Sequence, residues 1–367
     1  MFIINMANRR TNKKTKRKSS TGKTANKIGI IVGINDDECM NYKLYPELKN
    51  IPEDIQELSE INGKPSSDVS IAYIAQQRNK NKQIDILSMD DINVETFKQY
   101  DMVIGLFEAT NLSINEGYDE FKRYLRVVRQ SGVRFYPQPD FIDFAAHKFR
   151  WIKHLEKNGL PVLDTIAIRN DKGITYAKEV LKKIERKGWG EFITKPEVSA
   201  YSVGFKKWKP TTTPQQLQKY ISDNYEDNMG DKILVQRYVK EFHDFHEIRT
   251  YWINNKYRYA IGTIIEHSVT KADGRLNILY DLPENEGGNI EMHVMKQLKY
   301  WGKKALKCIP HDTSLIVRID FGCCIDNRKN CREYFINEIE YMPNVFCNKT
   351  KFPVISEMAK NIIRLSN

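Results

Sequence analysis

The strongest constraint on the fold is an alternation of short apolar runs with an amphipathic segment in the first 140 residues. The apolar runs have the length of buried strands and span residues 28–33, 69–75, 84–87, 101–107 and 133–136. Before the last of them, Tyr118, Phe121, Leu125 and Val128 recur at three- and four-residue steps, which predicts a helix over 115–132. Strands that alternate with helices are typical of an α/β layer with a largely parallel sheet.

The remaining two-thirds of the chain mixes helical and strand patterns without an internal repeat. We predict helices over 147–162, 174–190 and near 291–307, and strands over 164–168, 191–196, 233–239, 314–322 and 333–341. Residues 248–265 read as a β-hairpin that turns at Asn254 and Asn255, because this residue type tolerates the positive φ of tight hairpin turns. A polar loop is predicted over 266–290. The fold class is therefore α/β, with α+β lobes.

A chain of 367 residues suits two or three domains. The net charge of +11 is concentrated at the start, where residues 1–28 hold nine Lys/Arg and no acid, so the rest of the chain carries only about +2. Few large apolar residues lie there, so residues 1–27 are predicted to be a disordered basic tail. The sequence leaves open whether this tail only aids solubility or binds nucleic acid or an acidic partner.

No apolar stretch approaches the ~20 residues of a membrane span. The start of the chain lacks the pattern of a secretory signal. We therefore expect an intracellular, cytoplasmic protein, with nuclear entry through the basic tail left open. The six cysteines have no CxxC spacing and are expected to be reduced thiols, and Cys323, Cys324 and Cys331 lack the usual zinc-ligand spacing.

Four segments in the second part of the chain offer the groups that a nucleoside triphosphate and its metal require. They are Lys148, Lys195 with the loop that follows it, the run LVQRYV (234–239), and RID (318–320) with NEIE (337–340). Lysines and a Ser/Gly loop supply charge-assisted hydrogen bonds to phosphates. Carboxylates from two neighbouring strands supply hard oxygen ligands for Mg²⁺. Asp320 lies inside an apolar strand, where a buried acid requires a partner.

Together these segments resemble the ATP-grasp superfamily, which includes D-alanine–D-alanine ligase, glutathione synthetase and the ribosomal-protein glutamate ligase. The resemblance covers roughly residues 137–367 and rests on five motifs in order. KPEVSAYSVGF resembles the phosphate loop, LVQRYV the adenine hinge strand, HEIRTYWINNKYRYAIG an acid-x-Arg strand with its hairpin, and RIDF with NEIE the metal pair. The two lysines, 47 residues apart, have a spacing familiar in that superfamily.

The resemblance implies an ATP-grasp fold preceded by a Rossmann-like α/β domain. The implied boundaries are 28–140 for that domain, 141–235 for the N-terminal ATP-grasp lobe and 236–367 for the C-terminal lobe. The residues that it implies for nucleotide binding are Lys148, Lys195, Ser202, Gly204, Gln236, Tyr238, Val239, and Glu247 or Glu241 for the ribose. Asp320, Glu338 and Glu340 would bind Mg²⁺, with Mn²⁺ as an alternative. Arg318 and Lys195 would be catalytic.

Two positions depart from the pattern of the superfamily. Glu340 stands where the second metal strand usually has Asn, and Ala200-Tyr201 replaces one usual Gly of the phosphate loop. Tyr201 is therefore a candidate for closing over the nucleotide or for facing the substrate. Further substrate contacts are expected from Arg249, Lys271 and Arg275.

The implied reaction is the ADP-forming ligation of a carboxylate to an amine through an acyl phosphate. The substrate would be an amino acid, a peptide or a protein, and the oligomeric state stays open. Two alternatives remain at this stage. One is a kinase of the inositol-phosphate type, for which Lys206, Lys207 and Lys209 near the loop are the basis. The other is a nucleotide-binding scaffold without turnover, for which Glu340 is the best support.

Overall fold

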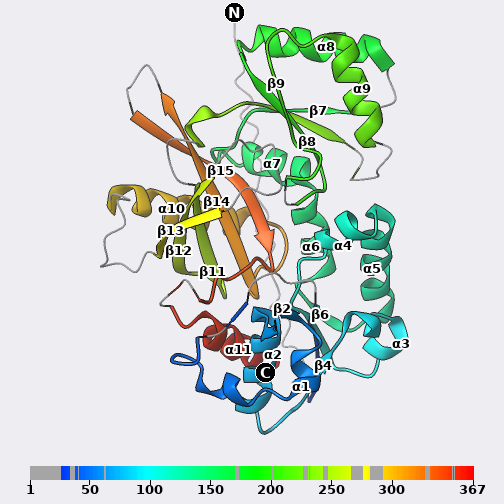
Figure 1. The fold of residues 1–367 in the computed structure, drawn as a ribbon, viewed down its shortest axis with the longest axis vertical. Helices are drawn as coiled ribbons and strands as arrows, with labels where there is room; N and C mark the ends of the chain where they lie inside the picture. Colours follow the sequence, from blue (N-terminus) through cyan, green and yellow to red (C-terminus); the bar gives the residue numbers. More distant parts are fainter. Residues whose placement is uncertain are drawn as a thin grey trace, which may run out of the picture.

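The computed structural model describes residues 26–33, 38–39, 41–61, 63–169, 173–200, 202–225, 230, 232–242, 247–265, 276–281, 292–326, 331–348, 350 and 352–367. They form three main sheets that are stacked along the long axis of the molecule (Figure 1). The parallel sheet lies at one end, a small antiparallel sheet at the other, and a larger antiparallel sheet between them. Residues 1–25, which hold most of the predicted basic tail, lie outside the described part of the chain.

The first sheet is parallel throughout, as the alternation of apolar runs predicts. Its order is β4 (Gln83–Leu87), β1 (Lys27–Ile31), β5 (Met102–Gly105) and β6 (Arg134–Tyr136). Helix α5 (Tyr118–Ser131) buries the predicted face with Phe121, Leu125 and Val128. Shorter elements connect the strands: η1 (Pro46–Asn50), α1 (Glu53–Gln56), β2 (Glu60–Ile61), β3 (Lys64–Pro65), η2 (Met89–Asp91), α3 (Val94–Phe97) and α4 (Thr110–Asn115).

The strand predicted over 69–75 is wrong, because these residues belong to helix α2 (Ser67–Arg78). Every residue from Ser67 to Ala75 is buried, so the helix has no polar face that would give it a helical sequence pattern. A short apolar run of this kind does not distinguish a buried strand from a buried helix. The start of the helix is fixed by Asp68, whose carboxylate accepts hydrogen bonds from the Gly33 and Val69 amides.

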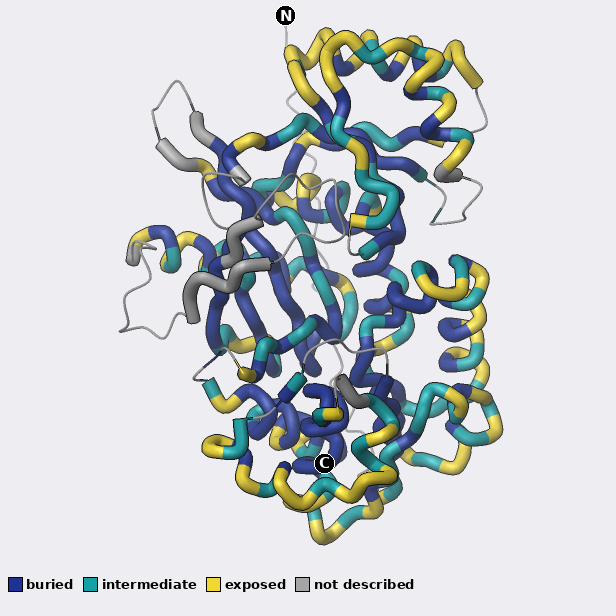
Figure 2. Tube along the Cα trace, viewed as in Figure 1, coloured by how far each residue is buried: buried dark blue, intermediate teal, exposed yellow. Residues whose placement is uncertain are grey.

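The small antiparallel sheet has its own hydrophobic core. Its order is β7 (Thr165–Ile168), β10 (Ile233–Arg237), β8 (Phe192–Pro196) and β9 (Lys206–Trp208), and the sequence did not predict β9. Helices α8 (Gly173–Arg186) and α9 (Pro214–Tyr225) cover one face, with their outer sides exposed (Figures 1 and 2). Phe192 stacks on Trp208 inside this core, with ring centroids 6.1 Å apart.

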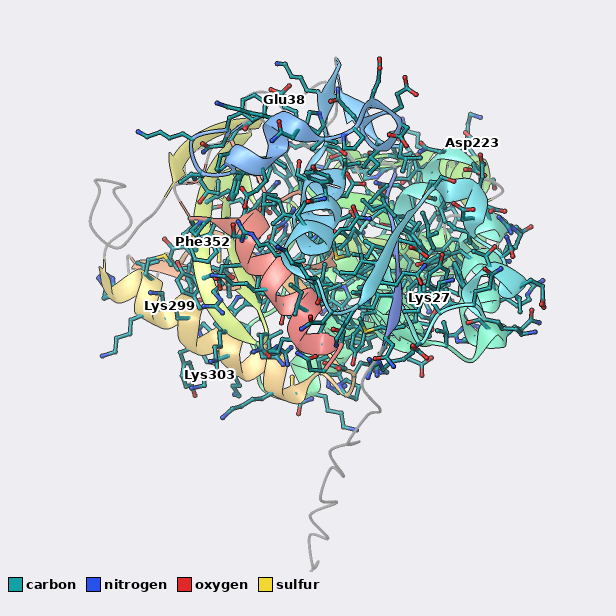
Figure 3. All side chains as sticks on the ribbon, turned by 90° about the horizontal axis from the view of Figure 1, so that it is seen from below. Lys27, Glu38, Asp223, Lys299, Lys303 and Phe352 are labelled. Carbon is teal, nitrogen blue, oxygen red and sulfur yellow. A yellow bond between two sulfur atoms is a disulfide. The ribbon has the colours of Figure 1, made fainter. Side chains whose placement is uncertain are left out.

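The larger sheet is antiparallel and contains the two strands with the acidic residues. Its order is β13 (Leu276–Asp281), β12 (Lys256–Ile265), β11 (Glu247–Ile253), β14 (Ile316–Asp326) and β15 (Cys331–Tyr341). The hairpin prediction is confirmed, with positive φ at Asn254 and Asn255. The uninterrupted polar loop predicted over 266–290 is wrong, because β13 lies inside it and completes the sheet edge. Helix α10 (Met292–Cys308) follows, with Lys299 and Lys303 along its outer side (Figure 3).

Two helices between β6 and β7 and one helix after β15 complete the fold. They are α6 (Pro139–Ala146), α7 (Lys148–Lys157) and α11 (Val354–Leu365). Helix α11 packs against α2 near the parallel sheet (Figure 3), while its Asn361 side chain donates hydrogen bonds of 2.8 Å to the Ser314 and Leu315 carbonyls before β14. One continuous core therefore joins the parallel sheet to the larger antiparallel sheet. This core holds the strands with the acidic residues in a fixed position relative to the loops of the parallel sheet.

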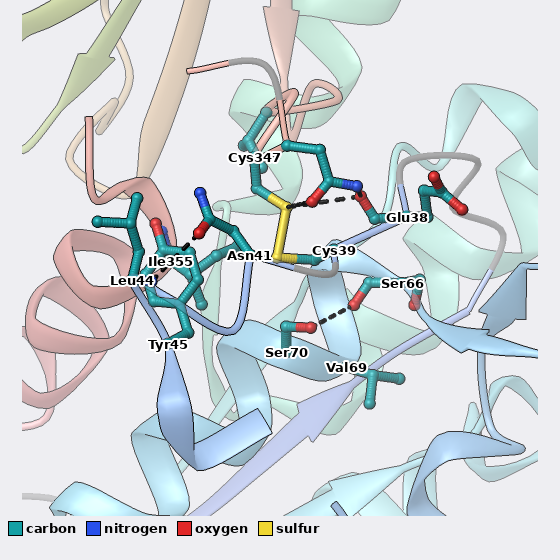
Figure 4. The surroundings of a disulfide bond; sticks show 12 residues. Glu38, Cys39, Asn41, Leu44, Tyr45, Ser66, Val69, Ser70, Cys347 and Ile355 are labelled. Atoms are coloured by element: carbon teal, nitrogen blue, oxygen red, sulfur yellow. Dashed lines mark hydrogen bonds between the residues drawn. A yellow bond between two sulfur atoms is a disulfide. The ribbon is translucent and has the colours of Figure 1, made fainter. Parts of the chain in front are cut away.

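The expectation of six reduced thiols is wrong for one pair. Cys39 and Cys347 form a disulfide with Cα atoms 5.7 Å apart, and it joins the segment after β1 to the segment after β15 (Figure 4). Beside it, the Asn348 side chain donates a 2.9 Å hydrogen bond to the Glu38 carbonyl. The two cysteines are 308 residues apart, so no local spacing in the sequence could indicate their contact. Cys308, Cys323 and Cys324 are not part of a disulfide.

Among the described residues, none of the helices combines the length and the apolar character that crossing a membrane requires.

Candidate active site

Three carboxylates converge where β14 and β15 pair. The register places Arg318 opposite Glu340 and Asp320 opposite Glu338, so side chains two residues apart share one face of the sheet. One oxygen each from Asp320, Glu338 and Glu340 lies within 4.8 Å of the others. This group is the only candidate metal cluster found among the described residues. The structure thus brings together the three residues that were predicted as metal ligands.

Arg318 is held in this group by two of the carboxylates. Its Nε and Nη2 atoms each donate a 2.8 Å hydrogen bond to Asp320, and Nη2 also donates to Glu340 at 2.5 Å. Its side chain is buried. Within the described part of the chain its Nη1 group donates no hydrogen bond, which leaves that edge of the guanidinium for a ligand.

The two predicted lysines lie close to the carboxylates but differ in their partners. Lys148, the first residue of α7, forms an ion pair of 3.2 Å with Glu338, and its Nζ donates to the Ser199 carbonyl. Lys195, near the end of β8, has no ion pair among the described residues. Lys195 therefore offers an uncompensated positive charge.

The electrostatics of the group follow from burial and charge. Burial lowers the pKa of Lys195 to about 8, an effect that Lys148 reinforces and Glu338 opposes. Burial raises the pKa of Asp320 to about 6 despite the Arg318 guanidinium. Burial also raises the pKa of Glu340. For Glu338, burial is outweighed by Lys148, Lys195 and Arg318, which together hold its pKa below the ordinary value. A further cation at this group would stabilise the ionised carboxylates.

The neighbouring strand β11 adds a carboxylate, Glu247, and a guanidinium, Arg249, and both already contact other side chains. Glu247 accepts a 2.8 Å hydrogen bond from the Asn337 side chain through Oε1, and its Oε2 lies 3.1 Å from Arg249. Arg249 also lies 3.9 Å from Asp320. The structure thus places Glu247 and Arg249 beside the metal strands, so that neither residue faces an open surface.

The hinge strand β10 carries a buried amide with one unused acceptor. Gln236 donates to Thr165 at 2.8 Å through Nε2, but its buried Oε1 has no hydrogen-bond partner within the described residues. Val239, two residues after the strand, packs with Leu163, Cys324 and Phe335 in a small apolar cluster. Glu241 is buried on the short η4 turn (Lys240–Phe242) that follows. A buried hydrogen-bond acceptor and an apolar cluster are the kinds of group that an adenine ring requires.

The loop after β8 turns back on itself at two positions with positive φ. Ser202 has φ 58° and Gly204 has φ 70°, and the Gly204 carbonyl accepts a hydrogen bond from the Tyr220 hydroxyl. Ser202 is exposed, so the loop presents its hydroxyl to solvent. The backbone N–H of Tyr238 donates to the Glu191 carbonyl at 2.9 Å, which ties the hinge to the strand beside the loop.

Some predictions fall on residues that the structure does not describe. Tyr201, Lys271 and Arg275, predicted as substrate contacts, lie outside the described residues. Cys323 and Cys324 are described and are not part of a disulfide, but the side chain of Cys331 is not described. These positions stay predictions.

The sequence analysis missed one residue near the centre, Glu108. It follows β5 at the carboxyl end of the parallel sheet, and its charge interacts with those of Lys148, Arg318 and Glu338. The signal that could have identified it is its position, since ligands of open α/β sheets bind at the carboxyl ends of the strands.

Comparisons with known proteins identify the fold. No family model matches the sequence, and no curated protein matches it. Solved structures do match: D-cycloserine synthetase DcsG has a TM-score of 0.63 at 12% identity, over 93% of this chain and 100% of that one. D-alanine–D-alanine ligase from Bacillus anthracis, complexed with ATP, has a TM-score of 0.58 at 14% identity, over 93% and 97%. The ATP-grasp ligase PsnB, complexed with a minimal precursor variant, Mg and ADP, has a TM-score of 0.51 at 12% identity, over 93% and 98%. The chain has the ATP-grasp fold, as predicted.

Proposed function

We propose that the protein is an ATP-dependent, ADP-forming carboxylate–amine ligase that acts on an amino acid, a peptide or a protein. The observation that carries this proposal is the arrangement of Asp320, Glu338 and Glu340 around a firmly held Arg318, with the unpaired Lys195 beside them. The solved structures of the same fold are ligases and synthetases, one of them in complex with ATP and another in complex with Mg and ADP.

In this proposal ATP lies between the small sheet and the larger antiparallel sheet. The unused Gln236 Oε1 accepts the adenine amino group, and the cluster around Val239 contacts the ring. Glu247, at the start of β11, is the candidate for the ribose, with Glu241 on the η4 turn as the alternative. Lys148, Lys195 and the loop with Ser202 and Gly204 bind the phosphates.

The three clustered carboxylates fit Mg²⁺, which prefers hard oxygen ligands. Asp320, Glu338 and Glu340 would hold it, and bound metal neutralises charge on the phosphates. The raised pKa values of Asp320 and Glu340 fit such a site, since a divalent cation would favour their ionised forms. Glu340 in place of the usual Asn is therefore compatible with metal binding.

The chemical step is an in-line transfer followed by acyl transfer. An oxygen of the substrate carboxylate forms a bond to the γ-phosphorus while the bond to ADP breaks, and Lys195 neutralises charge on the transferred group. The amine then adds to the acyl carbon of the acyl phosphate. The free edge of Arg318 donates to the oxyanion that develops there, before phosphate leaves.

Removing a single carboxylate should weaken the apparent affinity for magnesium. Asp320→Asn and Glu338→Gln should each raise the Mg²⁺ concentration needed for half-maximal ATP turnover, because each loses one anionic ligand. Glu333→Gln, an exposed acid on β15, serves as the control. Wild-type magnesium dependence in both site variants would place the metal elsewhere.

The affinity for ATP should fall as the pH rises above about 8. The Lys195 pKa of about 8 means that free protein loses this charge near that pH, whereas phosphate contact favours the protonated form. Binding then takes up a proton, so each further pH unit costs up to about tenfold in affinity. Titration calorimetry of Mg-ATP between pH 7 and 9.5 measures this, and Lys195→Met should bind more weakly with no such slope. An equal slope in that variant would assign the titration to another group.

An inositol-phosphate type of kinase is not favoured by the position of its candidate lysines. Lys206 and Lys207 lie on β9 with Lys209 just after it, in a surface pocket of about 540 Å³ that includes none of the side chains around Asp320. Lys207 pairs with Glu191 at 2.9 Å and covers the Tyr238 ring. These lysines are thus partly engaged beside the hinge.

The experiment that tests the proposal is a screen for ADP release across amino acids, short peptides and inositol phosphates. Hydroxylamine is added to each reaction, because it converts an acyl phosphate into a stable hydroxamate. A ligase should release ADP and give hydroxamate with at least one carboxylate. Phosphate transferred to a hydroxyl, with no hydroxamate from any carboxylate, would support a kinase, and no turnover with any compound would support the scaffold alternative.

A further inference from the structure

A surface pocket of about 530 Å³ lies where α5 meets the helices α6 and α7. Helix α5 packs against α6, and α6 packs against α7, so side chains from all three helices reach it (Figure 1). None of the side chains assigned above to ATP, Mg²⁺ or the oxyanion lines this pocket. Its lining contains four cationic side chains and one carboxylate, which are Lys122, Arg126 and Arg129 of α5, Arg150 of α7 and Asp143 of α6.

The positive charges of the pocket are close together along α5. Lys122, Arg126 and Arg129 follow one another at steps of four and three residues, so their side chains are neighbours on one face of the helix. Like charges at this spacing repel one another and weaken a helix. A hollow with a surplus of one charge also concentrates ions of the opposite sign. The arrangement therefore favours an anion in the pocket.

Asp143 orients two of the arginines but cannot satisfy both. Arg150 Nη1 donates a 2.6 Å hydrogen bond to Asp143 Oδ2, and Arg129 Nη2 lies 4.0 Å from the same oxygen. Each guanidinium group has several N–H donors, and one carboxylate oxygen occupies few of them. Among the described residues, Arg150 has no other ion pair. Donors on both arginines therefore stay available to a ligand.

Acids outside the pocket lining balance its charge only weakly. Lys122 pairs with Asp119 at 2.5 Å and Arg129 with Asp140 at 3.1 Å, but the side chains of these two acids are 84% and 69% exposed. Exposed ion pairs contribute little to stability, so a bound anion can replace them. Arg126 forms no hydrogen bond or ion pair within the part of the chain that the structure describes.

The buried side chains of the lining form the base of the pocket. The Tyr118 hydroxyl and His147 Nε2 are 2.8 Å apart, and His147 Nδ1 lies 2.7 Å from the Asp143 carbonyl, which can only accept. Tyr118 and His147 are thus bonded to each other or to the backbone, and Leu125 beside them is apolar. Negative groups of a ligand meet the exposed cations, and its uncharged part meets this base.

We propose that the pocket between α5 and α7 binds a small molecule that carries two or more phosphate or carboxylate groups. Guanidinium groups bind both kinds of anion through paired, charge-assisted hydrogen bonds. The volume of about 530 Å³ lies within the range of roughly 300–1,000 Å³ that small-molecule sites have. The cations of α5 hold one negative group and Arg150 of α7 holds another. Because Lys148 and Lys195 are the cations proposed for ATP, this is a second anion site, and it does not rest on the proposed ligase function.

The first test maps the site on the wild-type full chain. Phenylglyoxal modifies accessible guanidinium groups, and mass spectrometry of the peptides gives the rate at each arginine. Inorganic tripolyphosphate and citrate are the probes, each added separately without Mg²⁺. At least one of them should slow the modification of Arg126, Arg129 and Arg150 in a saturable manner. Arg186, an exposed arginine of α8, is the control and should react as before. Unchanged rates at Arg126 and Arg150 with both probes, or equal slowing at Arg186, would overturn the proposal.

The second test measures affinity by titration calorimetry with the same two probes. It uses the full chain with Lys195→Ala, so that the proposed ATP phosphate site contributes little. Adding Arg126→Gln or Arg150→Gln should weaken binding by about tenfold or more, as expected for a lost charged hydrogen bond. Arg126→Gln breaks no ion pair among the described residues, so it should fold. Arg123→Gln removes the same charge from α5 outside the pocket lining, where Arg123 pairs with Glu120, and should bind normally.

The two probes distinguish the sources of negative charge. Tighter binding of tripolyphosphate assigns the site to phosphate groups, and tighter binding of citrate assigns it to carboxylates. An affinity that Arg126→Gln and Arg150→Gln leave unchanged would overturn the proposal. An equal loss in Arg123→Gln would also overturn it, because binding would then follow the charge of the helix and not the pocket.

Neither test depends on catalysis, so the site and the proposed function can fail separately. Saturable binding through Arg126 and Arg150, in a protein that gives no hydroxamate with any carboxylate, would refute the ligase and retain the anion site. Hydroxamate formation by a protein that binds neither probe in this pocket would do the opposite.

Discussion

Replacing Lys195 with alanine should abolish ATP turnover while the protein stays folded. Lys195 is the cation of the centre that has no ion pair among the described residues, so its charge is available for phosphate. Its loss leaves Lys148 alone, and Lys148 is already paired with Glu338. Because Lys195 has no ion pair of its own, its removal leaves no buried carboxylate unpaired and should cost little stability. ADP release at saturating ATP, with thermal unfolding in parallel, measures both effects.

The matched control is Lys187→Ala, which removes a lysine of the same lobe from an exposed pair with Asp164. It should leave turnover unchanged. Lys195→Arg should keep some ATP affinity, since it retains the charge, but its larger planar head should position the phosphate poorly. Turnover of Lys195→Ala at the wild-type rate would refute the assignment of Lys195 to the phosphates and with it the central geometry of the proposed function.

Much of the fold could be predicted because its strands are short apolar runs with clear ends. The strand with Ile28–Ile31, the helix with Phe121 and the hairpin at Asn254 follow directly from local patterns. Helix α2 could not be predicted, because a helix that is buried on every side loses its periodicity. Strand β13 was missed because its short run LNILYD is flanked on both sides by polar residues, which give the whole segment the composition of a loop.

The site shows a similar division between local and distant information. Asp320 and Glu338 could be predicted, because an acid in an apolar strand requires a partner and the next strand along the chain offers one. The position of Glu108 near the charged group could not be predicted, because it depends on how the parallel sheet packs on the larger sheet. The same holds for the Cys39–Cys347 disulfide, which joins segments after β1 and after β15.

Replacing Arg318 with methionine should slow product formation by ~10²–10³-fold, the usual effect of losing one oxyanion donor. In the structure two carboxylates hold the guanidinium, so its free Nη1 edge is oriented before the substrate arrives. Methionine removes both the donor and the partner of Asp320 and Glu340. Breaking a buried ion pair costs about 3–5 kcal/mol, so the variant should also unfold at a lower temperature. Arg258→Met, which breaks a more exposed pair between β12 of the same sheet and Glu357 of α11, controls for general destabilisation.

The partial reactions of the Arg318→Met variant distinguish a catalytic role from a structural one. An oxyanion develops only when the amine adds to the acyl phosphate, so formation of the acyl phosphate should suffer less than formation of product. Hydroxylamine at high concentration traps the acyl phosphate directly, and the hydroxamate yield should therefore fall by a much smaller factor than the rate of ligation. Arg318→Lys, which keeps a charge but loses the two-point attachment to Asp320, should lie between the variant and wild type in both assays. If hydroxamate and product fell by the same factor in Arg318→Met, Arg318 would act on phosphoryl transfer or on the fold, and the oxyanion would need another donor.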